Sequence, residues 1–149
     1  MSRKRGRSKE RIPEKCKPQN RNTFSRAGEK FKWSFDKCLW GKVPWRKDIH
    51  WFADEIISKL KHYEDITWNE VESASGGKAQ GNGSNNHFLT PDALTREAIK
   101  ILGDIIRDYE KVFSLRLTNV ERLIGVVEGA VFYILYYDDR HFTAKNSKR

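Results

Sequence analysis

The sequence of 149 residues has few cysteines, one methionine and no long apolar run. Its two cysteines, Cys16 and Cys38, are too few for a disulfide framework or for a cysteine cluster that holds a metal. No stretch of about 18 apolar residues occurs, so we expect no membrane span. The basic N-terminus is not followed by an apolar segment, so we expect no secretory signal. These absences predict a cytoplasmic protein with reduced thiols.

The common motifs of nucleotide and metal sites are also missing. The Ser73–Asn86 stretch is rich in Gly, Ser and Asn, but it lacks the GxxxxGK[ST] pattern and no strand leads into it. It therefore predicts a flexible connector, with a lid as the alternative. No HxxxH or HExxH spacing occurs, so we expect no metal and no cofactor. We interpret His50 and His62 as ordinary helix residues, and His87 as a residue of a sheet edge or of the site.

Positive charge is concentrated at the start of the chain. The net charge is +9, and residues 1–30 hold eleven Lys or Arg and three Glu, which gives +8. The other 119 residues hold 18 basic and 17 acidic side chains, which gives +1. Residues 1–29 have very few apolar side chains, so we expect a disordered basic tail that binds polyanions or is only a solvated leader. Its candidate nucleic-acid-binding residues are Arg3, Lys4, Arg5, Arg7, Lys9 and Arg11.

The remainder predicts one domain over residues 30–143, with the 73–86 insertion and a basic C-terminal tail at 144–149. Alternating apolar and polar residues predict a strand at Phe31–Phe35, followed by a loop at Leu39–Trp45. Apolar residues at three- and four-residue steps predict a helix from Asp48, its N-cap, to Tyr63.

The second half predicts helices and then strands. Thr67 and Glu70 resemble a capping box, which predicts a short helix docked by Trp68. Thr90 and Pro91 predict the start of a helix that runs to about Tyr109.

Three strands follow, at Phe113–Thr118, Arg122–Val127 and Val131–Tyr137, with a two-residue turn at Glu128-Gly129. The expected fold class is α+β, with helices packed on one face of a small, mainly antiparallel sheet that ends in a three-stranded meander.

The candidate catalytic residues lie in this meander. Arg116 is on the polar side of its strand, Arg122 begins the central strand, Tyr137 ends the last one and His141 follows it. Arginines bind two phosphate oxygens at once, and histidine exchanges a proton near neutral pH. Because RNA carries its own nucleophile, the 2′-hydroxyl, these groups would suffice for cleavage without a metal. The alternative is that the arginines pair with nearby acidic residues and that His141 is an ordinary surface residue.

Five tryptophans gather in the N-terminal half of the chain. Aromatic residues at this spacing are typical of a hydrophobic core, and stacking on nucleic-acid bases is the alternative. The five are Trp33, Trp40, Trp45, Trp51 and Trp68.

The element order over residues 31–143 and the segments ERLIGVV, VFYILYYD and DDRHF resemble the RelE/ParE superfamily of small bacterial toxins from toxin–antitoxin modules. Members of this family that are ribonucleases cut mRNA on the ribosome without a metal, whereas others lack nuclease chemistry and act on DNA gyrase. The resemblance therefore implies a metal-independent endoribonuclease, with the second activity as the alternative, and a partner antitoxin. It matches Arg122 to the arginine that opens the central strand and His141 to the basic position after the last strand. Arg116 and Tyr137 are placed by geometry only. The chain departs from the family in its length, its basic tail and its 73–86 insertion.

The competing hypothesis is a non-catalytic nucleic-acid-binding or protein-interaction protein that uses the basic N-terminal tail.

Overall fold

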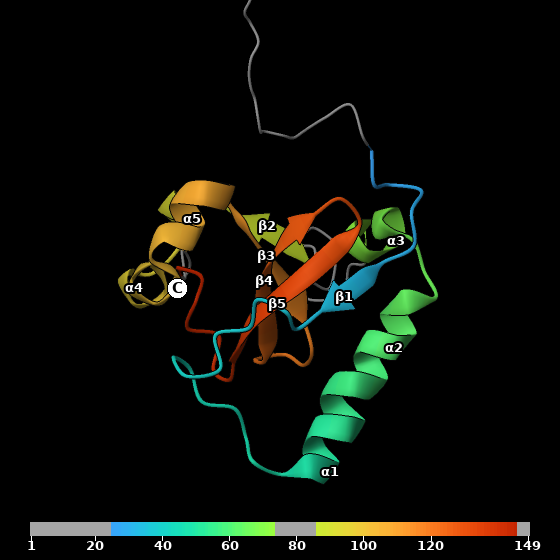
Figure 1. Cartoon of the computed structure of the whole chain (residues 1–149), viewed down its shortest axis with the longest axis horizontal. Helices are drawn as coiled ribbons and strands as arrows, with labels where there is room; N and C mark the ends of the chain where they lie inside the picture. The colour runs from blue at the N-terminus through green and yellow to red at the C-terminus, as the bar shows by residue number, and fades with distance from the viewer. Residues whose placement is uncertain (1–24, 74–85, 146–149) are drawn as a thin grey trace, which may run out of the picture.

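The structure is a computed structural model that describes residues 25–73 and 86–145. Residues 1–24, 74–85 and 146–149, which include most of both predicted tails and the centre of the predicted insertion, lie outside the described part. The elements in chain order are β1 (Lys32–Ser34), α1 (Ile49–Trp51), the π-helical segment η4 (Phe52–Ile57), α2 (Ser58–Glu64), α3 (Trp68–Ser73), β2 (His87–Leu89), the 3-10 turn η5 (Pro91–Ala93), α4 (Arg96–Leu102), α5 (Asp104–Tyr109), β3 (Val112–Arg116), β4 (Arg122–Glu128) and β5 (Val131–Asp138) (Figure 1).

The strands form one five-stranded sheet in the order β1-β5-β4-β3-β2. β1 runs parallel to β5, and the other neighbours are antiparallel. The predicted α+β class and the C-terminal meander of β3, β4 and β5 are confirmed. The sequence did not define β2, which brings His87 into the sheet edge opposite Ser114.

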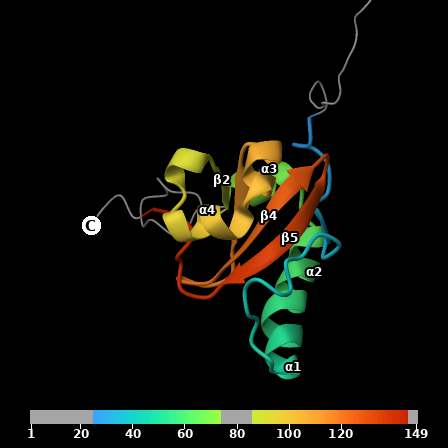
Figure 2. The same ribbon diagram turned by 60° about the vertical axis from the view of Figure 1, so that its left-hand side comes forward.

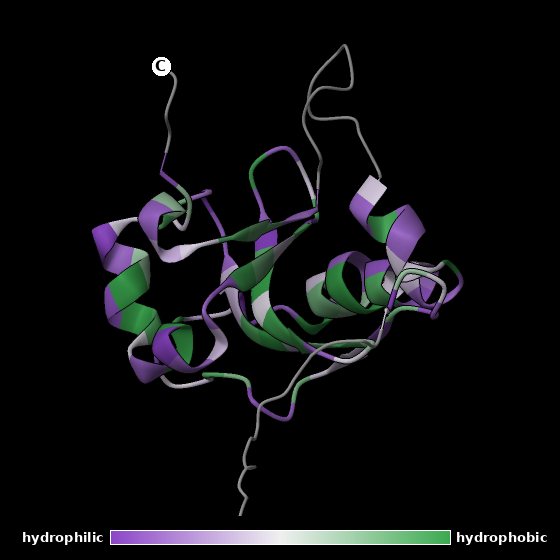
Figure 3. Ribbon diagram, turned by 90° about the horizontal axis from the view of Figure 1, so that it is seen from above, coloured by the Kyte–Doolittle hydropathy of each residue, from purple (hydrophilic) through white to green (hydrophobic). Residues whose placement is uncertain are grey.

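Helices cover both faces of the sheet, whereas the sequence predicted helices on one face only. The helical stretch from α1 to α3 lies on one side, and α4 and α5 lie on the other (Figure 2). Seen from above, the sheet stands between the two helical groups, and its strands are rich in hydrophobic residues (Figure 3). The first core includes Trp51, Ile56, Leu60, Trp68, Phe113, Leu115, Leu123 and Phe132. The second includes Leu94, Ala98, Leu102, Ile106, Ile124, Val126, Leu135 and Tyr136.

A register shift in the β4–β5 ladder explains why simple alternation fails in β5. The shift lies between Ile124 and Gly125, whose partners are Tyr136 and Ile134. Leu135 is the extra residue, and both Leu135 and Tyr136 belong to the second core. A bulge of this kind turns two consecutive side chains to one face. Strand residues contribute to both cores, and a helical layer covers each face of the sheet.

The first helical stretch begins at its predicted N-cap. The Asp48 carboxylate accepts hydrogen bonds from the backbone N–H groups of His50 at 2.9 Å and Trp51 at 3.3 Å. Within the stretch, η4 is π-helical, a rare geometry that is frequent at functional sites. It leads directly into α2, whose exposed side lines the pocket described below.

The predicted capping box forms at α3. The backbone N–H of Thr67 donates to Glu70 Oε1 at 2.8 Å, and the N–H of Glu70 donates to Thr67 Oγ1 at 3.2 Å. Trp68 is fully buried and donates from Nε1 to the backbone oxygen of Ala130 at 2.7 Å. The prediction that Trp68 docks α3 on the core is confirmed.

The helix predicted from Thr90 to Tyr109 is divided into three pieces. η5 ends at Ala93, and the extended backbone of the next residue, Leu94, forms an isolated bridge with Ala144. α4 then restarts with Thr95 as its N-cap, since Thr95 Oγ1 accepts from the N–H of Ala98 at 3.1 Å. A second break falls at Gly103, which has a φ of 54°.

The folded unit extends past both predicted boundaries. The backbone oxygens of Ala27 and Glu29 accept hydrogen bonds from Asn69 and Trp68, at 3.0 and 2.9 Å. At the other end, the N–H of Lys145 donates to the oxygen of Ala93 at 2.8 Å. Residues 25–29 and 144–145 are thus part of the domain rather than of the tails.

None of the helices in the described ranges has the length and apolar character needed to cross a bilayer.

Candidate functional site

Two arginines lie side by side where β3 and β4 join. Arg116 and Arg122 are Cα partners in the β3–β4 ladder, and the turn between them is closed by a hydrogen bond from Leu117 N–H to the oxygen of Glu121 at 2.9 Å. The pKa of Arg122 is lowered by burial and, next, by the charge of Arg116. Two guanidinium groups are therefore close enough to repel each other. We call these two residues the arginine pair.

Arg122 is held by backbone oxygens rather than by an acidic partner. Its Nη1 donates to the oxygens of Thr118 at 2.6 Å and Glu121 at 3.0 Å. Its Nε is buried and has no hydrogen-bond partner within the described residues. Asp138 is its Cα partner on β5 and raises the Arg122 pKa through its charge. No salt bridge joins Arg122 to an acidic side chain in the described part of the chain.

A pocket of about 400 Å³ lies between α2 and the end of β3, and we call it the α2–β3 pocket. Lys59 donates from Nζ to the oxygen of Leu117, which fixes α2 against the β3–β4 turn. Arg116 donates from its guanidinium to Asn119. The lining residues are Ser58, Lys59, His62, Tyr63, Arg116 and Leu117.

The charges of both members of the arginine pair act on the hydroxyl of Tyr63. Burial raises the pKa of its hydroxyl, while an Asn86 hydrogen bond and the charges of Arg116 and Arg122 oppose the rise. Asn86 is buried and positions this region, because its Nδ2 donates to the oxygen of Val71 at 2.9 Å and its Oδ1 accepts from the N–H of Arg116 at 2.8 Å. The pocket thus gathers cationic groups, a tyrosine hydroxyl and the exposed imidazole of His62.

Tyr137, a predicted site residue, lies in the first core. Its ring stacks on Trp45 with centroids 5.5 Å apart, and only 2% of the residue is exposed. Its hydroxyl donates to the Glu121 carboxylate. Burial, and then that carboxylate, raise the pKa of the hydroxyl. Tyr137 is connected to Arg122 only indirectly, since the Glu121 backbone oxygen accepts from Arg122.

His141, the other predicted residue, lies in the loop that follows β5. It is exposed and has a φ of 59°. The loop is folded around the buried carboxylate of Asp138, which accepts from the N–H groups of Phe142 and Thr143, both at 2.9 Å. In the described residues, no contact joins His141 to the α2–β3 pocket. The structure therefore brings Arg116 and Arg122 together, and places Tyr137 and His141 elsewhere.

The sequence interpretation treated His62 as an ordinary helix residue, and the structure places it in the lining of the α2–β3 pocket. Lys59, His62 and Tyr63 are three and four positions apart, a spacing that puts side chains on one face of a helix. That spacing is the sequence pattern that could have grouped these three residues on one helix face. What the sequence did not reveal is that this face meets the end of β3.

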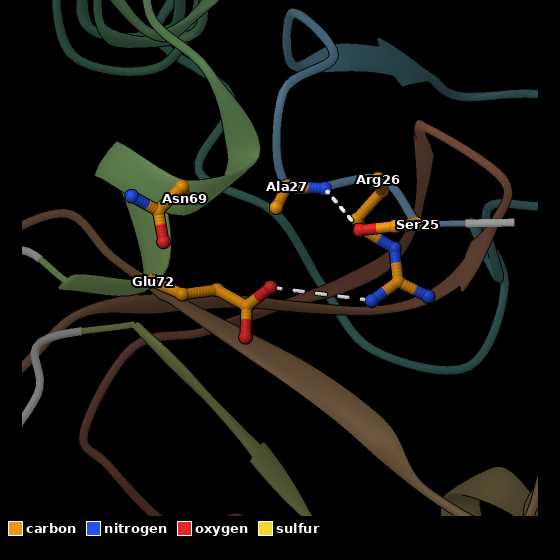
Figure 4. Close-up of a pocket in the computed structure, with 5 residues that line it drawn as sticks. All are labelled: Ser25, Arg26, Ala27, Asn69 and Glu72. Atoms are coloured by element: carbon orange, nitrogen blue, oxygen red, sulfur yellow. Dashed lines mark hydrogen bonds and ion pairs between the residues drawn. The ribbon is translucent and has the colours of Figure 1, made fainter.

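A second concavity, of about 410 Å³, lies where residues 25–27 dock on α3. Figure 4 shows the Arg26 guanidinium and the Glu72 carboxylate turned toward each other, with Nη1 and Oε2 4.0 Å apart. Arg26 also donates from Nε to the oxygen of Gly129 at 3.0 Å, and its guanidinium lies 5.5 Å from the centre of the Trp68 ring. These contacts explain how the start of the domain is fixed.

No group of three or more His, Cys, Asp or Glu residues gathers as a possible metal site within the described ranges. The six basic residues proposed for nucleic-acid binding, at positions 3–11, lie outside those ranges. Comparisons with protein-family models, with curated proteins and with solved structures found no match.

Proposed function

We propose that this protein is a toxin-like endoribonuclease that cleaves mRNA on the ribosome without a metal ion. The observation that carries the proposal is the arginine pair beside the α2–β3 pocket. Arg116 and Arg122 are cross-strand partners, and the pocket adds Lys59 and His62 to the same region. Cations held close together against repulsion are stabilised by an anion, and a phosphodiester is the anion that RNA supplies.

The pocket supports cleavage by the substrate's own 2′-hydroxyl. His62 takes the proton of that hydroxyl, and the 2′-oxygen attacks phosphorus to form a 2′,3′-cyclic phosphate. The bond from phosphorus to the 5′-oxygen breaks, and the 5′-oxygen takes a proton from water while His62 returns its proton to solvent. Arg116 and Lys59 stabilise the charge that develops on the phosphoryl oxygens. Arg122 reinforces this field from its half-buried position.

The test uses the full chain with an end-labelled mRNA in EDTA, with and without ribosomes. We expect cleavage, products that end in a cyclic phosphate, and no cleavage at a 2′-deoxy position. Arg116→Ala and His62→Ala should each lower the rate by roughly 100-fold or more. The matched controls are Lys100→Ala and His50→Ala, both at exposed helical positions, and these should keep the wild-type rate. Equal activity of the pocket variants and the controls would contradict the assignment.

The toxin part of the proposal has a separate readout. Expression of the chain should arrest bacterial growth, and Arg122→Ala should relieve the arrest. A small protein encoded beside it should neutralise the toxicity by covering the cationic pocket. If the arrest persists in the Arg122→Ala variant at equal expression, the arginine pair is not its cause.

The second candidate is a non-catalytic nucleic-acid-binding protein, and the observation in its favour is the net charge of +8 in residues 1–30. The discriminating deletion is residues 1–24, because residues 25–29 hydrogen-bond to α3 and belong to the fold. This second hypothesis predicts that the deletion abolishes RNA binding. The endoribonuclease hypothesis predicts that cleavage is largely retained.

A further inference from the structure

Trp40 differs from the other tryptophans in its exposure. Trp51 and Trp68 are buried, Trp33 and Trp45 are half-buried, and 55% of Trp40 is exposed. It lies in the connection between β1 and α1, which crosses β5 in Figure 1 and is attached there by a 2.8 Å hydrogen bond from Leu39 N–H to the oxygen of Leu135. A large aromatic ring is thus held at the surface by a fixed segment.

The Trp40 ring rests on other rings that reach into the core. It stacks on Phe35 with centroids 5.5 Å apart and planes inclined by 23°, and it lies 5.4 Å from Trp45. Trp45 in turn stacks on the buried ring of Tyr137 at 5.5 Å. One side of the exposed ring is therefore packed against aromatic neighbours. We call Trp40, Phe35 and Trp45 the aromatic platform.

The segment that carries the platform is strongly basic. Residues 37–47 contain Lys37, Lys42, Arg46 and Lys47 and no acidic residue. Lys42 donates to the oxygen of Ile101 and Lys37 lies over the Tyr133 ring, so these two are engaged with the second helical layer and the sheet. Arg46 and Lys47 are exposed and form no ion pair with an acidic side chain among the described residues.

Arg46 lies on the same aromatic cluster as the platform. Its guanidinium is 4.6 Å from the centre of the Trp51 ring, and its charge acts on Tyr137, which stacks on Trp45. The nearest acidic residue in sequence, Asp48, is occupied as the N-cap of α1. A stacking ring flanked by cations is the combination that binds single-stranded nucleic acid, whose bases expose their faces and whose phosphates need positive charge.

We infer that the aromatic platform binds single-stranded RNA, with an unpaired base stacked on Trp40 and the flanking phosphates held by Arg46 and Lys47. The choice of RNA rests on the proposed function. The platform and the arginine pair are joined by consecutive contacts, from Trp45 to Tyr137, from Tyr137 to Glu121 and from Glu121 to Arg122. The platform is thus connected to Arg122 through Tyr137 and Glu121, and its role would be to hold the strand rather than to cut it.

The experiment measures fluorescence anisotropy of the full chain with a labelled 2′-O-methyl RNA ten-mer, which cannot be cleaved by its own 2′-oxygen. Trp40→Ala should weaken binding roughly ten-fold, the order of effect found when a base loses its stacking ring. Trp40→Phe should stay within about two-fold of wild type, and Trp40→Leu, which keeps an apolar side chain but no ring, should resemble Trp40→Ala. The control is Ile49→Ala, at another apolar residue that is 70% exposed. Urea unfolding of each variant checks that the fold is intact.

A second measurement locates the base directly. RNA that carries 5-iodouridine is irradiated with the full chain, and the cross-linked peptide is identified by mass spectrometry. Cross-linking at Trp40 supports the inference.

Wild-type affinity of Trp40→Ala with cross-links elsewhere would overturn the inference, and the cleavage proposal would still be tested by its own assay. Wild-type affinity of Trp40→Leu would also overturn it, since that result fits an apolar docking surface for a protein. If no RNA is cleaved but Trp40→Ala still weakens binding, the platform stands and the endoribonuclease proposal fails.

Discussion

Arg116 and Arg122 are partners in the β3–β4 ladder, and the pKa of Arg122 is lowered by burial and, after it, by the charge of Arg116. Like charges at directly opposed positions destabilise a sheet. The fold nevertheless fixes Arg122 through the backbone oxygens of the β3–β4 turn, and leaves its Nε without a hydrogen-bond partner within the described residues. Of the two arginines, Arg116 lines the α2–β3 pocket, and Arg122 is its neighbour in the ladder.

The first prediction is that a divalent anion stabilises the folded protein. If sulfate binds the arginine pair with a Kd about a tenth of its concentration, stability rises by about 1.4 kcal/mol and Tm by roughly 3–6 °C over chloride at matched ionic strength. Arg116→Gln should remove the specific part of this rise and keep the general salting effect. Arg107→Gln changes an exposed arginine on α5 and should keep the full rise. Equal responses in the two variants would show that the anion acts elsewhere.

The second prediction concerns Gly125 in β4. A Cβ at this position would lie 2.1 Å from the Tyr133 oxygen and 2.7 Å from Cε1 of Phe132, so β5 would have to move. Gly125→Ala should lower the free energy of unfolding by at least about 2–4 kcal/mol, measured by urea denaturation. The control is Gly41→Ala, whose Cβ would have no neighbour within 4 Å and which should change stability by about 0.5 kcal/mol or less.

Local patterns in the sequence predicted those elements whose boundaries are set by their own residues. Asp48 and the Thr67–Glu70 box mark helix starts by hydrogen bonds within a few residues, and both are confirmed. The break at Leu94 has a distant cause. The N–H of Thr95 donates to the oxygen of Thr143 at 2.9 Å. This hydrogen bond to the segment after β5 replaces a bond within the helix. No local pattern contains that contact.

In the candidate site, too, some features follow from local sequence and others depend on distant contacts. Alternation along two strands joined by a short turn is enough to expect Arg116 near Arg122, and the ladder places them opposite each other. The pocket also needs the packing of α2 against the end of β3, a contact between residues more than fifty positions apart in the chain. The bulge in β5 likewise altered which side chains turn inward, so the environment of Tyr137 was not predicted.

The third prediction is that stability falls in alkaline solution. Burial raises the pKa of the Tyr63, Tyr136 and Tyr137 hydroxyls above the value of about 10 that tyrosine has in the unfolded chain. The unfolded state therefore loses these protons first. The stabilisation is fully present below about pH 10 and decreases as the pH rises above it. Urea unfolding from pH 8 to 11 measures the slope, and Tyr137→Phe should make it shallower. Ionisation of every tyrosine of the native protein with a midpoint near pH 10 would contradict the prediction.

The fourth prediction is that Asp138 stabilises the loop that carries His141. Its Oδ1 accepts from the N–H groups of Arg140 and Phe142, and its Oδ2 accepts from that of Thr143. An amide keeps one acceptor oxygen and presents N–H groups to the other backbone donors. Asp138→Asn should therefore cost about 1–3 kcal/mol in unfolding free energy. Asp139→Asn, at an exposed residue paired with Arg140, should cost about 0.5 kcal/mol or less. Equal costs would mean that the buried carboxylate has no special role.

The last prediction separates the two histidines that are candidates for proton transfer. His62 lines the pocket with Arg116, whereas His141 lies in the loop around Asp138. If the pocket is the cleavage site, His62→Ala should lower the rate of RNA cleavage by about 100-fold or more, and His141→Ala should lower it by less than about three-fold. The measurement is single-turnover cleavage at pH 5.5 to 8.5, where loss of a general base should also flatten the rise of rate with pH. If His141→Ala abolishes cleavage and His62→Ala does not, catalysis is centred on the loop after β5.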